Sequence, residues 1–200
     1  MKTILFDLGN VIAFFDHRRG LARLTPFSPL TVEEMYTSVY AGEIEDRIER
    51  GQVTPATYLR DVHKLWQLRC DVDFLAHVIG DVFWANQETC ELATRLSDRY
   101  RLLIASNTNA VHARRFLKQF AGVFKHFHHL VLSYEVGVRK PETDFYHTCL
   151  RYANAKPSEC VFIDDLEANV VGARNFGFHA IAYQPNDDLT GQLAALGVVL

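Results

Sequence analysis

Acidic side chains end two short apolar runs of this sequence. Asp7 ends the run TILF, and the pair Asp164 and Asp165 ends the run CVFI. A carboxylate at such a position is a candidate nucleophile or a candidate ligand for a hard metal ion. The alternative is that these acids are solvated turn residues, which Gly9 after Asp7 would favour. Their chemistry therefore depends on whether the fold brings them together.

Two further polar stretches follow apolar runs. Ser106 and Asn107 come directly after RLLIA, and Lys140 stands before Pro141 in the loop that follows LVLS. The hydroxyl and amide groups are short neutral donors suited to phosphate oxygens, and the lysine supplies one positive charge. Taken singly, Ser106 could instead be a helix N-cap and Lys140 a solvated loop lysine.

The elements that would position these groups alternate between strand and helix from residue 88 onward. Apolar runs at 101–105, 130–133, 160–163 and 179–182 read as strands, and segments with helical spacing lie between them. This alternation predicts an α/β, Rossmann-like parallel sheet with helices on both faces. Ligands bind such sheets at the carboxyl ends of the strands, so the polar residues named above are expected to share one edge.

The segment between the first strand and this alternating region has a different character. Charges and apolar residues at helical spacing predict a small all-helical insertion, with a capping box at Thr31 and Glu34 and a further helix beginning at Thr54-Pro55. A third helix is expected over 73–84. The predicted organisation is therefore a discontinuous core of residues 1–14 and 87–200 with a helical domain of residues 15–86. Six side chains in this region or directly before it are candidates to face the core: Phe14, Tyr36, Tyr40, Arg47, His63 and Trp84.

Three carboxylates at one edge would repel and raise one another's pKa unless a cation compensates them. Lys140 supplies one positive charge, and a divalent ion that prefers oxygen ligands would supply the rest. Mg²⁺ is the usual ion where few protein carboxylates combine with waters and a phosphate. A nucleophile, a metal, a cation and a hydroxyl together indicate a phosphoryl-transfer site.

Composition excludes several classes of partner. The 200 residues carry 21 basic and 24 acidic side chains, a net charge of -3, which offers no field for nucleic acid or a membrane surface. No signal peptide or membrane-spanning run is visible, and the four cysteines are scattered without C-x-x-C spacing. We expect a cytoplasmic protein, monomeric or homodimeric, whose partner is a small phosphorylated substrate.

Four ordered stretches, FDLGNV, ASNTN, GVRKPE and FIDDLEANVVGARNFG, resemble the motifs of the haloacid dehalogenase superfamily. The resemblance implies a Rossmann-like core with a cap domain at the helical insertion, and it is most similar to bacterial sugar phosphatases of the alpha-D-glucose-1-phosphate type. It implies that Asp7 becomes an aspartyl phosphate and that Ser106, Asn107 and Lys140 hold the phosphate. It further implies that Asp7, Gly9, Asp164 and Asp165 hold Mg²⁺.

Gly9 departs from the superfamily pattern. Most of its phosphatases carry a second Asp at this position, whose carbonyl binds the metal and whose side chain acts as general acid and base. Gly9 keeps only the carbonyl, and general acid-base help is worth ~10² to 10⁴ in rate. We therefore expect a modest phosphatase that favours sugar 1-phosphates, whose leaving group is more acidic, with Asp16 or His17 as candidate substitutes. Alternatively, Gly9 is present because the turn needs its backbone freedom.

Two other functions remain open at this stage. A metal-independent 2-haloacid dehalogenase would also use an aspartate nucleophile and a lysine without the second Asp, although the pair Asp164 and Asp165 would repel its carboxylate substrate. A catalytically weak protein that binds a phosphorylated ligand is the other alternative. A metal site at His126, His128 and His129 is less favoured, since no acid or cysteine lies near this run and it precedes a strand.

Overall fold

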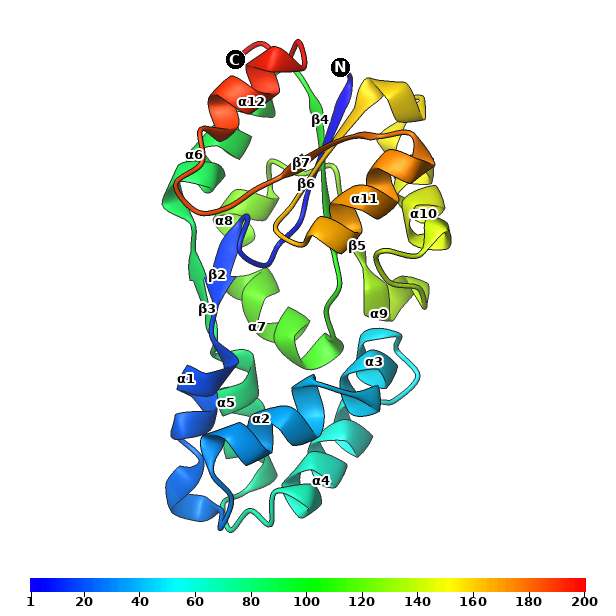
Figure 1. Ribbon diagram of the computed structural model, residues 1–200. Coiled ribbons are helices and arrows are strands. Elements are labelled where there is room, and N and C mark those ends of the chain that lie inside the picture. Colours follow the sequence, from blue (N-terminus) through cyan, green and yellow to red (C-terminus); the bar gives the residue numbers. More distant parts are fainter.

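The computed structural model describes residues 1–200. A five-stranded parallel sheet forms the centre of the larger of its two units (Figure 1). The strands lie in the order β5-β4-β1-β6-β7, and every neighbouring pair is parallel. This confirms the α/β, Rossmann-like prediction. The strand bounds are β1 Thr3–Phe6, β4 Arg101–Ser106, β5 His129–Leu132, β6 Cys160–Asp164 and β7 His179–Ala182.

Helices cover both faces of this sheet, which is why its strands are nearly continuous apolar runs. Side chains alternate along a strand, so Ile4 and Phe6 pack in one hydrophobic cluster with α6, α7, α8 and α12, whereas Leu5 packs in another with α10 and α11. The helix bounds are α6 Gln87–Leu96, α7 Ala110–Gln119, α8 Ala121–Phe124, α9 Ser133–Val136, α10 Thr143–Ala153, α11 Glu167–Phe176 and α12 Leu189–Ala195, with a 3-10 turn at Pro157–Glu159.

Five helices form a second unit, called here the helical subdomain (residues 17–80), at the carboxyl end of the sheet and away from both termini (Figure 1). It has a hydrophobic core of its own, in which Tyr58 and Trp66 are almost fully buried. The capping box of Thr31 and Glu34 is present. The bounds are α1 His17–Ala22, α2 Val32–Tyr40, α3 Glu43–Glu49, α4 Pro55–Leu65 and α5 Val72–Gly80, with a 3-10 turn at Thr25–Phe27.

The two units are connected by a β-ribbon of two strands. The prediction of an all-helical insertion was therefore wrong for the two ends of that insertion, which form these strands. Strand β2, Ala13–Phe15, pairs antiparallel with β3, Phe83–Ala85, a segment that the sequence analysis placed in a helix. Aromatic side chains explain the difference, since Phe14 lies opposite Trp84 with ring centroids 6.1 Å apart. Such cross-strand pairs stabilise a ribbon, but they join residues too distant in sequence for a local pattern to reveal.

None of the helices combines the length and the apolar character that spanning a lipid bilayer requires. All four cysteines are free thiols, and three of them are buried.

Candidate active site

Three carboxylates meet at the carboxyl edge of the central strands. β1 and β6 are neighbours, and the backbone N–H of Asp7 donates to the carbonyl of Ile163 at 2.8 Å, which extends the pairing into the loops. Carboxylate oxygens of Asp7, Asp164 and Asp165 all lie within 4.8 Å of one another. The structure therefore brings together the acids that the sequence analysis expected at one edge.

Lys140 lies between two of these acids. Its Nζ is 2.7 Å from Asp7 Oδ1 and 2.7 Å from Asp164 Oδ2, and its side chain is only 1% exposed. Asn107 positions the lysine: its Oδ1 accepts from the Lys140 backbone N–H at 2.8 Å, and its Nδ2 donates to the Lys140 carbonyl at 3.0 Å. Ser106 lies one residue earlier, on a small adjoining cavity of about 70 Å³ that Asn107 also lines.

Two asparagines that the sequence analysis did not single out hold the acids in place. Nδ2 of Asn10 donates to Asp165 Oδ2 at 2.9 Å, and Nδ2 of Asn169 donates to Asp164 Oδ1 at 2.9 Å. Asn10 has a φ of 55°, a left-handed conformation that asparagine tolerates better than most residues. Asn169 belongs to the helix that follows Asp165, and its place near the start of α11 was the only signal available in the sequence.

The negative charge of the three carboxylates at this site is not balanced by the positive charge of Lys140 alone. Burial raises the pKa of Asp7 to about 8, with further increases from the carboxylates of Asp164 and Asp165, against the lowering effect of Lys140. Burial also raises the pKa of Asp165. For Lys140, burial favours the neutral amine, but the carboxylates of Asp164 and Asp7 outweigh it and raise the pKa. Three carboxylates and one ammonium leave a formal surplus of two negative charges.

This surplus and the oxygen-only donor set fit a divalent cation such as Mg²⁺. Magnesium is held in proteins by one or two carboxylates together with waters and substrate phosphate, which matches three converging carboxylates beside an open cavity. A bound cation would also return the pKa of Asp7 toward its ordinary value by compensating the neighbouring acids.

The cavity at this edge measures about 340 Å³ and lies between the sheet and the helical subdomain. Asp7, Lys140 and Asp165 line its sheet side. Of the six candidates, Tyr36 and Tyr40 line this cavity. Four further residues reach it from the ribbon, α1 and α3: Phe15, His17, Glu45 and Glu49.

The other candidates from residues 14–84 do not reach this cavity. Phe14 and Trp84 pair with each other on the ribbon, His63 bonds to the carbonyl of Cys70 at 2.7 Å, and Arg47 lines a separate pocket. Asp16 is an exposed N-cap that accepts from the Arg19 N–H. Their orientation depends on packing that helical periodicity does not determine.

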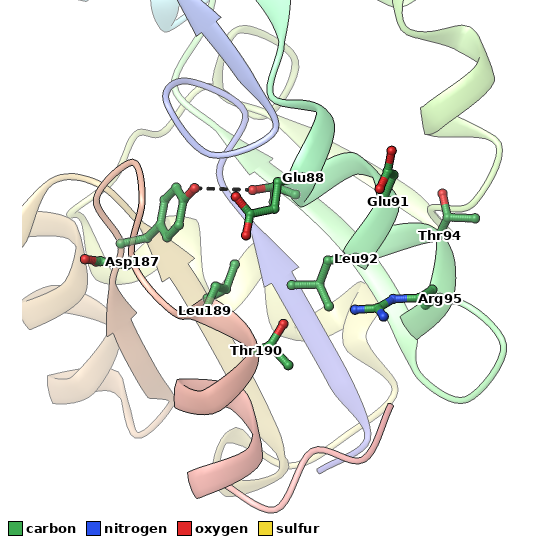
Figure 2. Close-up of a pocket in the computed structure, with 10 residues that line it drawn as sticks. Glu88, Glu91, Leu92, Thr94, Arg95, Asp187, Leu189 and Thr190 are labelled. Carbon is green, nitrogen blue, oxygen red and sulfur yellow. Dashed lines mark hydrogen bonds between the residues drawn. The ribbon is translucent and has the colours of Figure 1, made fainter.

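A larger cavity, of about 490 Å³, lies elsewhere, between α6 and the loop that leads into α12 (Figure 2). Its lining includes Glu88, Glu91, Arg95 and Asp187, but none of the residues of the acidic cluster. The histidines of the 126–129 run also lie outside any group of metal-ligating side chains.

Gly9 is explained by a close contact and not by its backbone angle. The left-handed residue of this turn is Asn10, while Gly9 has no positive φ, so the conformational explanation of this glycine was wrong. A Cβ at position 9 would lie 2.9 Å from a ring carbon of Phe15 and 3.9 Å from Asp7 Oδ2. The Phe15 ring therefore occupies the space into which a second acid would project.

Gly9→Asp is consequently expected to destabilise the protein by about 1–3 kcal/mol, the usual cost of overpacking. The cost should be smaller in a Phe15→Ala background, because the two side chains compete for one space. Urea unfolding of the two single variants and the double variant measures this coupling. Equal costs in both backgrounds would contradict the packing explanation. Gly9→Asp alone is thus no test of a missing acid.

A Rossmann-like sheet with its polar groups gathered at the carboxyl edge defines an α/β protein with a ligand site at that edge. The family model of the haloacid dehalogenase-like hydrolases matches residues 1–177. The chain therefore belongs to this family of hydrolases.

Among curated proteins, a D-ribitol-5-phosphate phosphatase from Bacteroides thetaiotaomicron is 20% identical and aligns over 94% of this chain and 93% of its own length. A drimenol cyclase from Aspergillus calidoustus is 24% identical over 96% of this chain, and a flavin mononucleotide hydrolase from Arabidopsis thaliana is 34% identical over 31% of it. The chain spans only 36% and 25% of the length of these two relatives.

Solved structures support the fold. A variant of a HAD family enzyme from Bacteroides thetaiotaomicron, in complex with magnesium and inorganic phosphate, has a TM-score of 0.87 at 23% identity, covering 96% of this chain and 98% of its own. L-2-haloacid dehalogenase from Xanthobacter autotrophicus, with chloropropionic acid covalently bound, has a TM-score of 0.66 at 18% identity, covering 100% of this chain and 85% of its own.

Proposed function

We propose that this protein is a Mg²⁺-dependent phosphatase of a small phosphorylated metabolite and that it works through an aspartyl-phosphate intermediate on Asp7. The observation that carries the proposal is the surplus of negative charge around Asp7, which lines an open cavity beside Asp164, Asp165 and Lys140. A hydrolase with that arrangement can hold a cation and a phosphate next to a carboxylate nucleophile.

In this mechanism an oxygen of Asp7 attacks phosphorus, and Lys140 neutralises charge between the nucleophile and the phosphate. Asp7, Asp164, Asp165 and the Gly9 carbonyl would hold Mg²⁺, which when bound screens the phosphate oxygens from the attacking carboxylate. Ser106 would donate its hydroxyl to the phosphate. Since the Asn107 side chain already bonds the Lys140 backbone, we assign it a double role, in which it also offers its remaining amide hydrogen to the phosphate.

The substrate class that we propose is a sugar phosphate such as glucose 1-phosphate, with residues 15–86 acting as a cap. A cavity of about 340 Å³ is at the small end of ligand sites, which suits a compact metabolite. Its wall combines the rings of Tyr36 and Tyr40 with the carboxyl groups of Glu45 and Glu49, a lining that can bind hydroxyl groups. The similarity to a D-ribitol-5-phosphate phosphatase is consistent with this class.

The proposed setting is a reducing compartment such as the cytoplasm, with the protein as a monomer or homodimer. Free thiols at all four cysteines are consistent with such a compartment.

A phosphate-release screen over sugar phosphates, nucleotides and acyl phosphates tests the proposal. We expect release with Mg²⁺ that falls to background when EDTA removes the metal, because the acids around Asp7 are then uncompensated. Restoring excess Mg²⁺ serves as the control. Activity dominated by nucleotides would contradict the proposed substrate class, and full activity in EDTA would contradict the metal site.

The absence of a side chain at Gly9 also suits the dehalogenase alternative, so chloride release from 2-chloropropionate should be measured with and without EDTA. We expect none, because Asp164 and Asp165 would repel the substrate carboxylate when no cation is bound. Chloride release that persists in EDTA would favour the dehalogenase.

A further inference from the structure

Two glutamates of helix α3 face the cavity from the side opposite the sheet. Glu45 and Glu49 are one helical turn apart, and both line the cavity together with Asp7 and Gly9. Helix α3 belongs to the helical subdomain and lies beside α9 at the carboxyl end of the sheet (Figure 1). A phosphorylated substrate in this cavity would therefore be in reach of both Asp7 and the glutamates of α3.

The two glutamates differ in their partners. Nη2 of Arg139 is 2.6 Å from Glu49 Oε2, and Nη1 is 2.6 Å from Asp46 Oδ1, so this guanidinium is engaged by two other acids. Glu45 has no salt bridge within 4.0 Å, and its Oε2 is buried without a hydrogen-bond partner. Glu49 Oε2 likewise accepts no hydrogen bond of good geometry, but it is paired with the Arg139 cation, so Glu45 is the cavity-lining acid of α3 without a cationic partner.

The surroundings of Glu45 favour its protonated form. Burial and the neighbouring Glu49 raise the pKa of Glu45 to about 8, against smaller lowering effects of Arg139 and the Asn109 amide. The other titratable groups around it are Tyr40 and Tyr58, whose pKa values burial raises, and His17 and His112, whose pKa values burial lowers. At neutral pH these four side chains are uncharged, so Glu45 faces no free cation.

We propose that Glu45 is the proton donor for the leaving oxygen, the role for which Gly9 has no side chain. This inference rests on the proposed phosphatase function. In an in-line displacement the leaving oxygen lies opposite the nucleophile across phosphorus, and Glu45 lines the same cavity as Asp7 but comes from the helical subdomain. Neither substitute expected from the sequence fits, because Asp16 is exposed outside the cavity and neutral His17, with a pKa lowered by burial to about 4, has few protons to give.

The step balances as two proton transfers. In the first half, the bond between Asp7 oxygen and phosphorus forms, the bond to the leaving oxygen breaks, and the Glu45 carboxyl gives its proton to that oxygen. In the second half, the Glu45 carboxylate takes a proton from the water that attacks phosphorus. Inorganic phosphate leaves, the Asp7 carboxylate is regenerated, and Glu45 is protonated again.

The test compares a substrate that needs a proton donor with one that does not. For Glu45→Gln we expect kcat/KM on ribose 5-phosphate, whose leaving group is an alkoxide, to fall ~10²-fold or more. On p-nitrophenyl phosphate, whose leaving group departs as the anion, kcat/KM should stay within about threefold of wild type, because kcat/KM reports the first half-reaction and not the later attack of water. Glu43→Gln, an exposed acid of the same helix, is the matched control and should change neither rate.

A pH profile separates proton donation from simple substrate binding. In the wild type, kcat on ribose 5-phosphate should fall as the pH rises through the pKa of Glu45, and this limb should be missing in Glu45→Gln. Glu45→Asp keeps the carboxyl group and should retain more activity than Glu45→Gln. This second variant provides the test if Glu45→Gln folds poorly. Equal losses of kcat/KM on both substrates, or a change in KM alone, would overturn the inference. Failure of the proposed function itself would be visible separately, as a wild type that releases no phosphate from p-nitrophenyl phosphate.

Discussion

Asp7→Asn is expected to lower phosphate release by ~10⁴-fold or more, the scale of loss seen when a covalent nucleophile is removed. The amide is nearly the same size as the carboxylate but is too weak a nucleophile to attack phosphorus. The substitution also removes one charged group from the site where Asp7, Asp164 and Asp165 converge. Among the substitutions considered, this one should have the largest effect on activity.

The measurement is Mg²⁺-dependent phosphate release by purified Asp7→Asn at saturating substrate. Asp16→Asn is the matched control, because Asp16 is an exposed N-cap and asparagine caps helices equally well. Thermal melting of both variants checks that each is folded. Retention of a substantial fraction of wild-type activity would contradict the nucleophile assignment, and a wild type without turnover would favour the phosphoryl-ligand-binding alternative.

Lys140→Met is expected to damage both stability and activity. The Lys140 side chain is only 1% exposed and contacts Asp7 and Asp164 at 2.7 Å each, so its loss leaves two buried carboxylates without their cation. Breaking a buried ion pair on one side costs about 3–5 kcal/mol. Lys140 also lowers the pKa of Asp7, so its removal leaves less of Asp7, the proposed nucleophile, ionised at neutral pH.

Urea unfolding without Mg²⁺ measures the first effect, and phosphate release with Mg²⁺ measures the second. Lys125→Met, which replaces an exposed lysine, should change the free energy of unfolding by no more than about 0.5 kcal/mol. Adding Mg²⁺ should recover part of the stability lost in Lys140→Met, because a divalent cation compensates the same carboxylates. A Lys140→Met protein as stable and active as wild type would show that the buried contacts carry little free energy.

Local patterns were sufficient for the architecture of the core. The apolar runs that end at Asp7, Ser106 and Asp164 are buried strands because helices cover both faces of the sheet. Parallel pairing with crossover connections brings residues more than 150 positions apart to the same edge, although the order of the strands itself was not predicted. The meeting of Asp7, Lys140 and the acidic pair was therefore accessible from the sequence.

Contacts between distant segments were not accessible. Asn10 bonds to Asp165 across 155 residues, Phe15 fills the space beside Gly9, and Phe14 pairs with Trp84 in a ribbon. Each depends on how two segments pack and not on a periodic pattern in either. The position of Glu45 was not accessible either. From the sequence alone, a charged residue on a short helix is expected to be exposed to solvent, and only the structure shows that Glu45 lines the cavity.

The most direct test of the central claim is to look for the covalent intermediate. Wild-type protein mixed with substrate is quenched in acid within the first turnovers, digested with trypsin and analysed by mass spectrometry, with attention to the peptide of residues 3–18. We expect the mass of one phosphoryl group on that peptide, located at Asp7, when Mg²⁺ is present, and an unmodified peptide when EDTA replaces the metal. A phosphoryl group on another residue, or one that forms equally well in EDTA, would contradict the account.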